Sequence, residues 1–207
     1  MGLLNLLLKN PLGFIIIAIP LLYAVIFHEL AHGWVAWRMG DPTARSMGRL
    51  SLNPLKHLDP MGTMMLFLVG FGWAKPVPVN FNRLRDKRLG MILVSGAGIA
   101  TNILLAFCAL FLYRLLSLPS SSIPAQLLYY FARINIILAA FNLIPLPPLD
   151  GSKILMGFAS PSVRNFLSRF ERYGFFIIIA LLFLGVLDPV INFFQWMIIS
   201  VIKVMLP

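Results

Sequence analysis

The residues of this chain that could carry out chemistry begin with His28-Glu29-Leu30-Ala31-His32. Residues four apart lie one above the other on a helix, so His28 and His32 can offer two imidazole nitrogens to one metal ion, with Glu29 beside them. A zinc hydrolase needs two such ligands, a third from elsewhere and an open position for a water molecule, whose proton a neighbouring carboxylate can take. The motif therefore predicts a zinc site with Glu29 as the general base.

A third metal ligand is expected from the segment that ends in Leu149-Asp150-Gly151. Three of the four residues 145–148 are prolines, so a helix cannot continue through them. A broken backbone at membrane depth survives only where it is buried in protein or lines a wet cavity. A carboxylate at that point, Asp150, is well placed to complete the metal site. The alternative is that Asp150 caps the N-terminus of a helix starting near Ser152.

The composition is that of an integral membrane protein. Of the 207 residues, 59% are hydrophobic and 12% are charged, which excludes an ordinary soluble domain. The net charge of +10 comes from Lys and Arg residues in three short polar segments. The positive-inside rule explains this pattern better than a nucleic-acid-binding stripe does. We expect a single multi-pass domain over residues 1–207, in contact with the lipid bilayer and without a nucleic-acid partner.

The apolar runs predict about five transmembrane helices. Asn10 and Pro11 predict the start of the motif helix, which should run to about Arg38. Further crossings are expected over residues 90–117, 126–144, 173–187 and 190–205, where the last two are either short helices joined by a tight turn at Asp188-Pro189 or one long bent helix. Residues 61–72 are too short to cross a core of ~30 Å and have basic flanks on both sides, which predicts a re-entrant segment. The fold class expected is an all-α polytopic membrane protein.

The segment after the re-entrant run, Trp73 to Asn80, is expected to be extended and to complete a short hairpin. Pro76 and Pro78 remove hydrogen-bond donors along one edge, so only the opposite edge, through Val77 and Val79, can pair fully with another strand. Such an edge could hold an unwound peptide by strand addition. A Pro-rich loop at the membrane surface is the alternative.

The charge pattern also predicts the depth of the site. Basic residues follow both Arg38 and Asp150, so both segments are expected on the cytoplasmic side. At 1.5 Å per residue, His32 lies roughly 9 Å and His28 roughly 15 Å from Arg38 along the helix. The two halves of the site are therefore expected to meet nearer the cytoplasmic face than the midplane.

These motifs together resemble those of the site-2 proteases, zinc metalloproteases that cut substrates within the membrane. The resemblance rests on the His28 to His32 motif, on Ala97-Gly98 with Asn102, and on the stretch from Asn142 to Gly151, in the family's order. It implies one Zn²⁺ per chain, held by the side chains His28, His32 and Asp150, with Glu29 as the general base.

The resemblance also implies substrate contacts. Asn142 and Asn102 would be polar groups near the substrate carbonyl and the developing oxyanion, although a lone Asn in a span can also serve as interhelical glue. The Trp73 to Asn80 segment would correspond to the hairpin with which the family is thought to hold its substrate. No PDZ-like insertion is seen, so the chain resembles a minimal form that selects substrates through its membrane part or through a regulatory partner.

The activity expected is that of an intramembrane zinc endopeptidase, which hydrolyses peptide bonds in or near transmembrane segments of membrane-protein substrates by metal-activated water. We expect a prokaryotic cell membrane as its location. The alternative is a zinc-binding or zinc-transporting membrane protein in which the same residues bind the metal without proteolysis.

Overall fold

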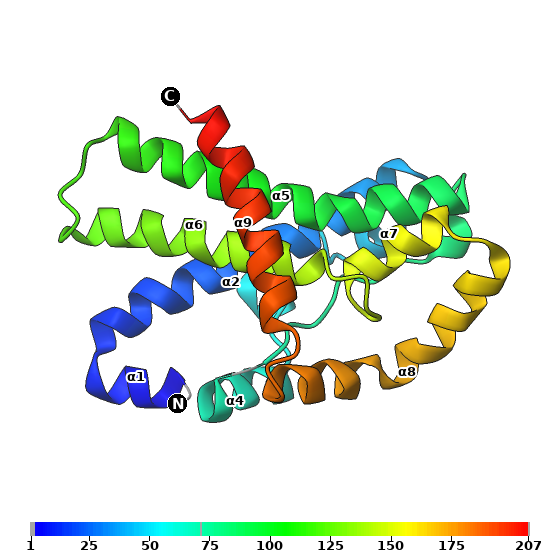
Figure 1. Ribbon diagram of the computed structural model, residues 1–207, viewed down its shortest axis with the longest axis horizontal. Coiled ribbons are helices and arrows are strands. Elements are labelled where there is room, and N and C mark those ends of the chain that lie inside the picture. The colour runs from blue at the N-terminus through cyan, green and yellow to red at the C-terminus, as the bar shows by residue number, and fades with distance from the viewer. Residues whose placement is uncertain (1–2, 71, 207) are drawn as a thin grey trace.

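The computed structural model describes residues 3–70 and 72–206. Residues 1–2, 71 and 207 of the expected domain lie outside the described residues, and residue 71 belongs to the expected re-entrant segment. The described part consists of helices joined by short irregular segments and contains no β-strand, which confirms the all-α class (Figure 1). The helices are α1 (Leu3–Lys9), α2 (Pro11–Arg38), α3 (Thr43–Ser46), η1 (Pro54–Lys56), α4 (Pro60–Val69), η2 (Phe81–Arg83), α5 (Lys87–Leu115), α6 (Ile123–Asn142), α7 (Asp150–Phe158), α8 (Pro161–Phe183) and α9 (Asp188–Met205).

Four of the described helices are long and apolar enough to cross a membrane, namely α2, α5, α6 and α9. The fifth expected crossing, residues 173–187, is largely the end of α8, whose first half carries Arg164, Arg169 and Arg172. The apolar part of α8, residues 173–183, measures only ~16 Å at 1.5 Å per residue, about half of the hydrocarbon core. Four of the described helices thus have the length and hydropathy of a span, and the expected count of five is not confirmed.

A turn separates α8 from α9, which confirms two helices over one long bent helix. The turn lies at residues 184–187, where Gly185 adopts a φ of 69°. Asp188 and Pro189, which were expected to form the turn, are instead the first residues of α9. Proline is tolerated there because the first N–H groups of a helix have no partner within it.

The motif helix α2 begins and ends where the sequence predicts. The side chain of Asn10 accepts a hydrogen bond from the Gly13 N–H at 2.9 Å, and Pro11 is the first helical residue. The helix continues to Arg38 and packs against α5 and α6. His28 and His32 are buried on its inner face.

The core lies where α5, α6 and α9 meet. In Figure 1, α5 and α6 lie side by side along the long axis, and α9 crosses α6. Small and β-branched residues at the crossing exclude solvent and allow close packing, among them Ile99, Ala106, Ala139, Ala140 and Ile198. This core holds α5 and α6 rigidly behind the motif helix.

The proline-rich break follows α6 as predicted. Residues 143–149 are irregular, and α7 begins at Asp150, with Leu149 at its N-cap and no side-chain cap bond. The alternative role of Asp150 as an N-cap is therefore not observed. A Cβ at Gly151 would lie 2.3 Å from the Leu143 carbonyl oxygen, so only glycine lets α7 start this close to the break. The break thus fixes where the Asp150 carboxylate emerges.

The segment after α4 is extended but is not a regular hairpin. An isolated antiparallel bridge joins Leu58 to Ala74, and the Lys75 N–H donates to the His57 carbonyl at 2.8 Å. The expected short hairpin is therefore reduced to one bridge within the described residues. From here on, residues 73–80 are called the strap.

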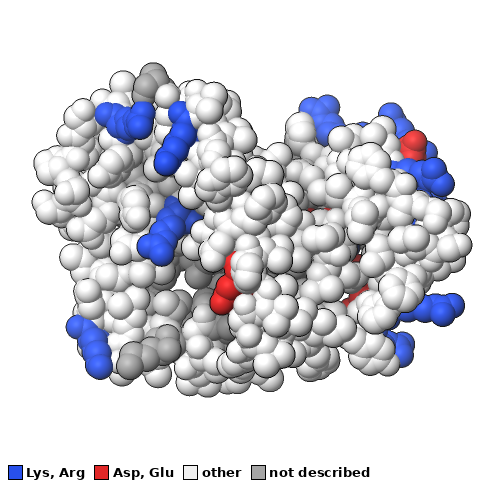
Figure 2. All heavy atoms as spheres, viewed as in Figure 1, with Lys and Arg blue, Asp and Glu red and all other residues white. Residues whose placement is uncertain are grey.

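Basic residues are distributed unevenly over the chain. Nine of its 17 Lys and Arg residues lie between positions 38 and 88, whereas residues 116–122, the turn between α5 and α6, contain none. Figure 2 shows basic side chains around the end of the molecule where α5 begins and others toward the opposite end, with a largely uncharged surface and a few acidic side chains between them. A largely uncharged surface of this kind suits contact with lipid.

Candidate metal centre

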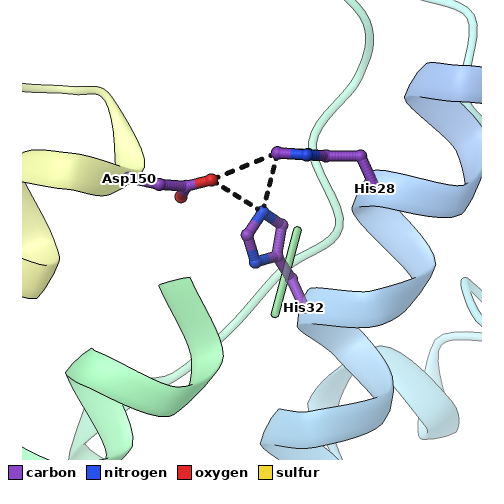
Figure 3. A group of neighbouring side chains, drawn as sticks. All are labelled: His28, His32 and Asp150. Atoms are coloured by element: carbon purple, nitrogen blue, oxygen red, sulfur yellow. Dashed lines mark hydrogen bonds and ion pairs between the residues drawn. The ribbon is translucent and has the colours of Figure 1, made fainter. Parts of the chain in front are cut away.

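Three side chains from two distant parts of the chain converge at one point (Figure 3). His28 and His32 project from α2 toward Asp150, the first residue of α7. Asp150 Oδ2 lies 3.1 Å from each histidine Nε2, and the two Nε2 atoms lie 3.0 Å apart. All three residues are buried, with side-chain exposures of 9% for His28 and 11% for both His32 and Asp150. The three atoms, called here the ligand triangle, form the group among the described residues that could hold a metal ion.

The hydrogen bonds behind the two histidines determine which ring nitrogens face the triangle with a lone pair. His32 Nδ1 lies 2.7 Å from the backbone carbonyl oxygen of Val94, and His28 Nδ1 lies 2.6 Å from Asn102 Oδ1. Both oxygens only accept, so both Nδ1 atoms carry the hydrogen and both Nε2 atoms of the neutral rings carry lone pairs. Three lone-pair atoms about 3 Å apart repel one another unless a cation lies among them.

The donor set fits zinc. Two imidazoles and one carboxylate, with a fourth position open, form a ligand set known from catalytic zinc sites. Four ligands at about 2.0–2.1 Å in a tetrahedron lie about 3.3 Å apart. The separations of 3.0 and 3.1 Å in the ligand triangle differ from this by only a few tenths of an ångström.

The third wall of the site is a glycine of α5. A Cβ placed on Gly98 would lie 2.5 Å from His32 Nε2 and 2.5 Å from His28 Cε1. By contrast, a Cβ on Gly96 would meet nothing within 4 Å. The small-residue stretch of α5 therefore lets the two imidazoles press directly against its backbone at Gly98.

Glu29 is held by the strap. Its Oε2 accepts a hydrogen bond from the backbone N–H of Val77 at 2.7 Å. Val77 is buried, and its flanking residues Pro76 and Pro78 have no N–H to donate. The donor edge of the strap therefore faces α2 and the metal centre, with the Val77 N–H directed at the proposed general base.

Polar side chains fasten the strap on both sides of Val77. The Arg49 Nη2 donates to the Lys75 carbonyl oxygen at 2.8 Å, and the Asn80 N–H donates to Asp41 Oδ2 at 2.6 Å. Asp41 also accepts from the hydroxyl and the N–H of Thr43. Burial alone would raise the pKa of Asp41, but these bonds and the charge of Arg83 outweigh it and lower the pKa below its usual value. A carboxylate thus anchors the end of the strap.

The remaining candidate residues are not members of the ligand triangle. Asn102 stands behind His28, and its Nδ2 donates to Asn135 Oδ1 at 2.7 Å and to the Ala24 carbonyl at 3.4 Å, which leaves no amide hydrogen for a substrate oxyanion. Asn142 is half-buried and donates to the Leu138 carbonyl of its own helix at 3.0 Å. Val79 packs beside the cluster formed by Ala36, Leu84 and Val94.

Sequence reasoning gave no role to Asn135. It lies on α6, is fully buried, and contacts Asn102 directly behind His28. The available signal was a second asparagine in an apolar span, since polar groups in neighbouring membrane helices seek one another. The spans alone do not specify that these two asparagines pair.

Comparison with known proteins gives consistent results. The family model described as "Peptidase family M50" matches residues 117–185. "Putative zinc metalloprotease YwhC" of Bacillus subtilis is 42% identical over 172 residues, which cover 80% of this chain and 78% of that protein. "Putative zinc metalloprotease Rip2" of Mycolicibacterium smegmatis is 31% identical, covering 86% and 69%, and "Putative zinc metalloprotease MJ0611" of Methanocaldococcus jannaschii is 35% identical, covering 70% and 71%. No solved structure matches the chain.

Proposed function

The chain belongs to peptidase family M50, the site-2 protease family, and from this premise we propose that it is an intramembrane zinc endopeptidase. Its family makes it a multi-pass zinc metalloprotease. We assign the zinc ligands to His28, His32 and Asp150, and the role of general base to Glu29. The substrates are transmembrane segments of other proteins, cut within or near the bilayer.

One observation carries this assignment. Three buried lone-pair atoms, two imidazole nitrogens and one carboxylate oxygen, face one another at 3.0 and 3.1 Å. Burying such atoms together costs free energy unless a cation compensates them. A structural role for these side chains offers no reason to orient all three lone pairs toward one point, whereas zinc binding does.

The chemistry is hydrolysis of a peptide bond. Zinc, when bound, polarises the scissile carbonyl and lowers the pKa of a water molecule at its open position. Glu29 takes the proton of the attacking water and passes it to the leaving amine. Its place next to His28 on α2, with Oε2 fixed by the Val77 N–H at 2.7 Å, supports this role because a general base must be held close to the reacting atoms.

The strap supplies a surface for an extended substrate. A peptide bond inside a helix is shielded by its own hydrogen bonds, so the substrate must unwind before cleavage. Pairing of the unwound segment with the backbone of Val77 and Val79 would hold it beside Glu29. Asn142 is retained as a candidate contact to the substrate.

The arrangement in the membrane is part of the proposal. The excess of basic residues between positions 38 and 88 supports a cytoplasmic location for the ends of α2 and α7, and so for the metal centre. We propose a prokaryotic cell membrane, with α4 as a re-entrant element. The apolar part of α8 is proposed as a fifth crossing in addition to α2, α5, α6 and α9. A regulatory partner is expected to select substrates, and nucleic acid has no part in the function.

The test combines metal content with cleavage in detergent-purified protein. Wild type should hold about one zinc per chain, and His32→Ala and Asp150→Ala should lose it. Glu29→Gln should keep the zinc and lose cleavage of any substrate that the wild type cuts, because an amide cannot accept the proton. The proposal fails if Asp150→Ala retains its zinc in full, or if Glu29→Gln cleaves at the wild-type rate.

A further inference from the structure

A line of buried polar groups runs behind His28 through three helices. His28 Nδ1 lies 2.6 Å from Asn102 Oδ1 on α5, and Asn102 Nδ2 donates to Asn135 Oδ1 on α6 at 2.7 Å. Asn135 Nδ2 in turn donates to the Phe131 carbonyl at 2.8 Å. Both asparagines have 0% exposure, so water does not compete for these bonds.

The backbone at Phe131 fixes the direction of the whole line. A carbonyl oxygen only accepts, so the NH₂ of Asn135 must face Phe131 and its oxygen must face Asn102. Asn102 then directs its NH₂ at that oxygen and at the Ala24 carbonyl 3.4 Å away, which turns its own oxygen toward His28. His28 must therefore carry its hydrogen on Nδ1 and present the Nε2 lone pair to the ligand triangle.

We infer that Asn102 and Asn135 are positioning residues, an amide relay that fixes the ring tautomer and orientation of His28 for metal binding. The inference rests on the proposed metal centre. His32 needs no such relay, because its Nδ1 faces the Val94 carbonyl, a backbone group that cannot turn over. The Asn102 amide could turn over and offer NH₂ to His28, and the short bond to Asn135 at 2.7 Å opposes this more strongly than the long bond to the Ala24 carbonyl at 3.4 Å.

Removing Asn135 tests the relay. In Asn135→Leu, only the long bond to the Ala24 carbonyl at 3.4 Å opposes turning of the Asn102 amide. A donor facing His28 Nδ1 then favours the tautomer with hydrogen on Nε2, whose Nε2 has no lone pair for zinc. Loss of a group that orients a metal ligand typically weakens affinity by about 10–100-fold, and we expect zinc affinity to fall within that range. The matched control is Asn142→Leu on the same helix, whose amide also donates to a carbonyl four residues back but does not contact His28. Only zinc affinity is compared, and Asn142→Leu should retain it.

A second substitution distinguishes tautomer control from packing. In Asn102→Asp with Asn135→Leu, residue 102 presents only acceptor oxygens, so it cannot offer a donor to His28 in either orientation. Zinc affinity should return close to the wild-type value, as in carboxylate–histidine–zinc arrangements. If the double variant binds zinc more weakly than Asn135→Leu alone, the asparagines act through packing and the relay is refuted.

A measurement on the unaltered chain completes the test. The chain has three histidines, so ¹⁵N-histidine NMR records two ring nitrogens for each of three rings. In metal-free protein whose histidine rings are neutral, His28 and His32 should carry hydrogen on Nδ1. His57, whose Nε2 donates to the Ser51 carbonyl at 2.7 Å, should show the opposite tautomer and serves as an internal reference.

The outcomes separate this inference from the proposed function. Hydrogen on Nε2 of His28 in metal-free wild type refutes the relay, whatever the protein does with zinc. Hydrogen on Nδ1 supports the relay even if the wild type fails to cleave any substrate. Failure of wild type to bind zinc refutes the proposed function alone.

Discussion

Placing a methyl group at Gly98 should destroy the metal centre without destroying the fold. In Gly98→Ala the new Cβ would lie 2.5 Å from His32 Nε2 and 2.5 Å from His28 Cε1, whereas ordinary contacts begin near 3.4 Å. One or both rings must therefore move by about 0.9 Å. Zinc sites hold their ligand distances within about 0.2 Å, so the displaced rings can no longer bind together with Asp150.

The size of the effect follows from two opposed contributions. Alanine in a helix interior is about 0.8–1.0 kcal/mol more favourable than glycine. Overpacking a buried position costs about 1–3 kcal/mol. The free energy of unfolding of metal-free Gly98→Ala should therefore fall by about 2 kcal/mol or less, while zinc affinity falls at least about 100-fold, the upper end of losses seen when ligand orientation is disturbed.

Gly96→Ala is the matched control, two residues away on the same helix with nothing within 4 Å of its Cβ. It should gain up to about 1 kcal/mol of stability and bind zinc as the wild type does. The assay is competition for zinc against a chelating dye in detergent, with thermal unfolding of both metal-free variants measured in parallel. If Gly98→Ala and Gly96→Ala bind zinc equally, the imidazoles do not lie against α5 and the site geometry described above is wrong.

Three further perturbations test other parts of the site. Chelating the zinc should lower the thermal unfolding temperature of the wild type, because free zinc at 100 times Kd contributes about 2.7 kcal/mol to the free energy of unfolding. An equal shift of the unfolding temperature in Asp150→Ala would contradict the ligand assignment. Val77→Pro removes the N–H that donates to Glu29, and the extended backbone is kept because Pro78 already favours it at residue 77. Cleavage should slow about tenfold or more with zinc content unchanged. A wild-type cleavage rate would show that this hydrogen bond does not position the base. Because the pKa of Asp41 is lowered on folding, its stabilising contribution is complete above about pH 4 and is lost as the pH falls through the lowered pKa. Thermal unfolding between about pH 2 and pH 5 should therefore show less acid sensitivity in Asp41→Asn than in the wild type, and identical profiles would exclude the anchor role of this carboxylate.

The parts of the site predictable from sequence are those set by local geometry. The spacing of His28 and His32 determines their common face on any helix, and prolines end a helix whatever surrounds them. These two rules predicted both histidines on one face of α2 and a break after α6, whereas the start of α7 at Asp150 itself was not predicted. Asp150 meets the histidines because α5 packs against both α2 and α7. From the sequence, only the expected membrane topology indicated that these segments lie at a similar depth.

The parts that could not be predicted depend on tertiary partners. Two asparagines in apolar spans can each pair with many groups, and only packing of α5 against α6 brings Asn102 to Asn135. Similarly, the Pro76 and Pro78 pattern shows that one edge of the strap lacks donors but does not show that the donor edge faces Glu29. The division of residues 161–205 into α8 and α9 depends on a turn at Gly185 and not on hydropathy.

A metal ion in the ligand triangle would also link two helices of this fold. The helix α7 packs against α5, and its described polar contacts with α2 run through Asp150 to His28 and His32. The irregular break before α7 is itself packed, because Ile144 and Leu149 are buried in a cluster with Ile178 and Leu187. Zinc binding would therefore join α7 to the motif helix across the face of α5. The ion held by His28, His32 and Asp150 would also activate the attacking water, so the chemistry and the link between α2 and α7 would depend on the same binding event.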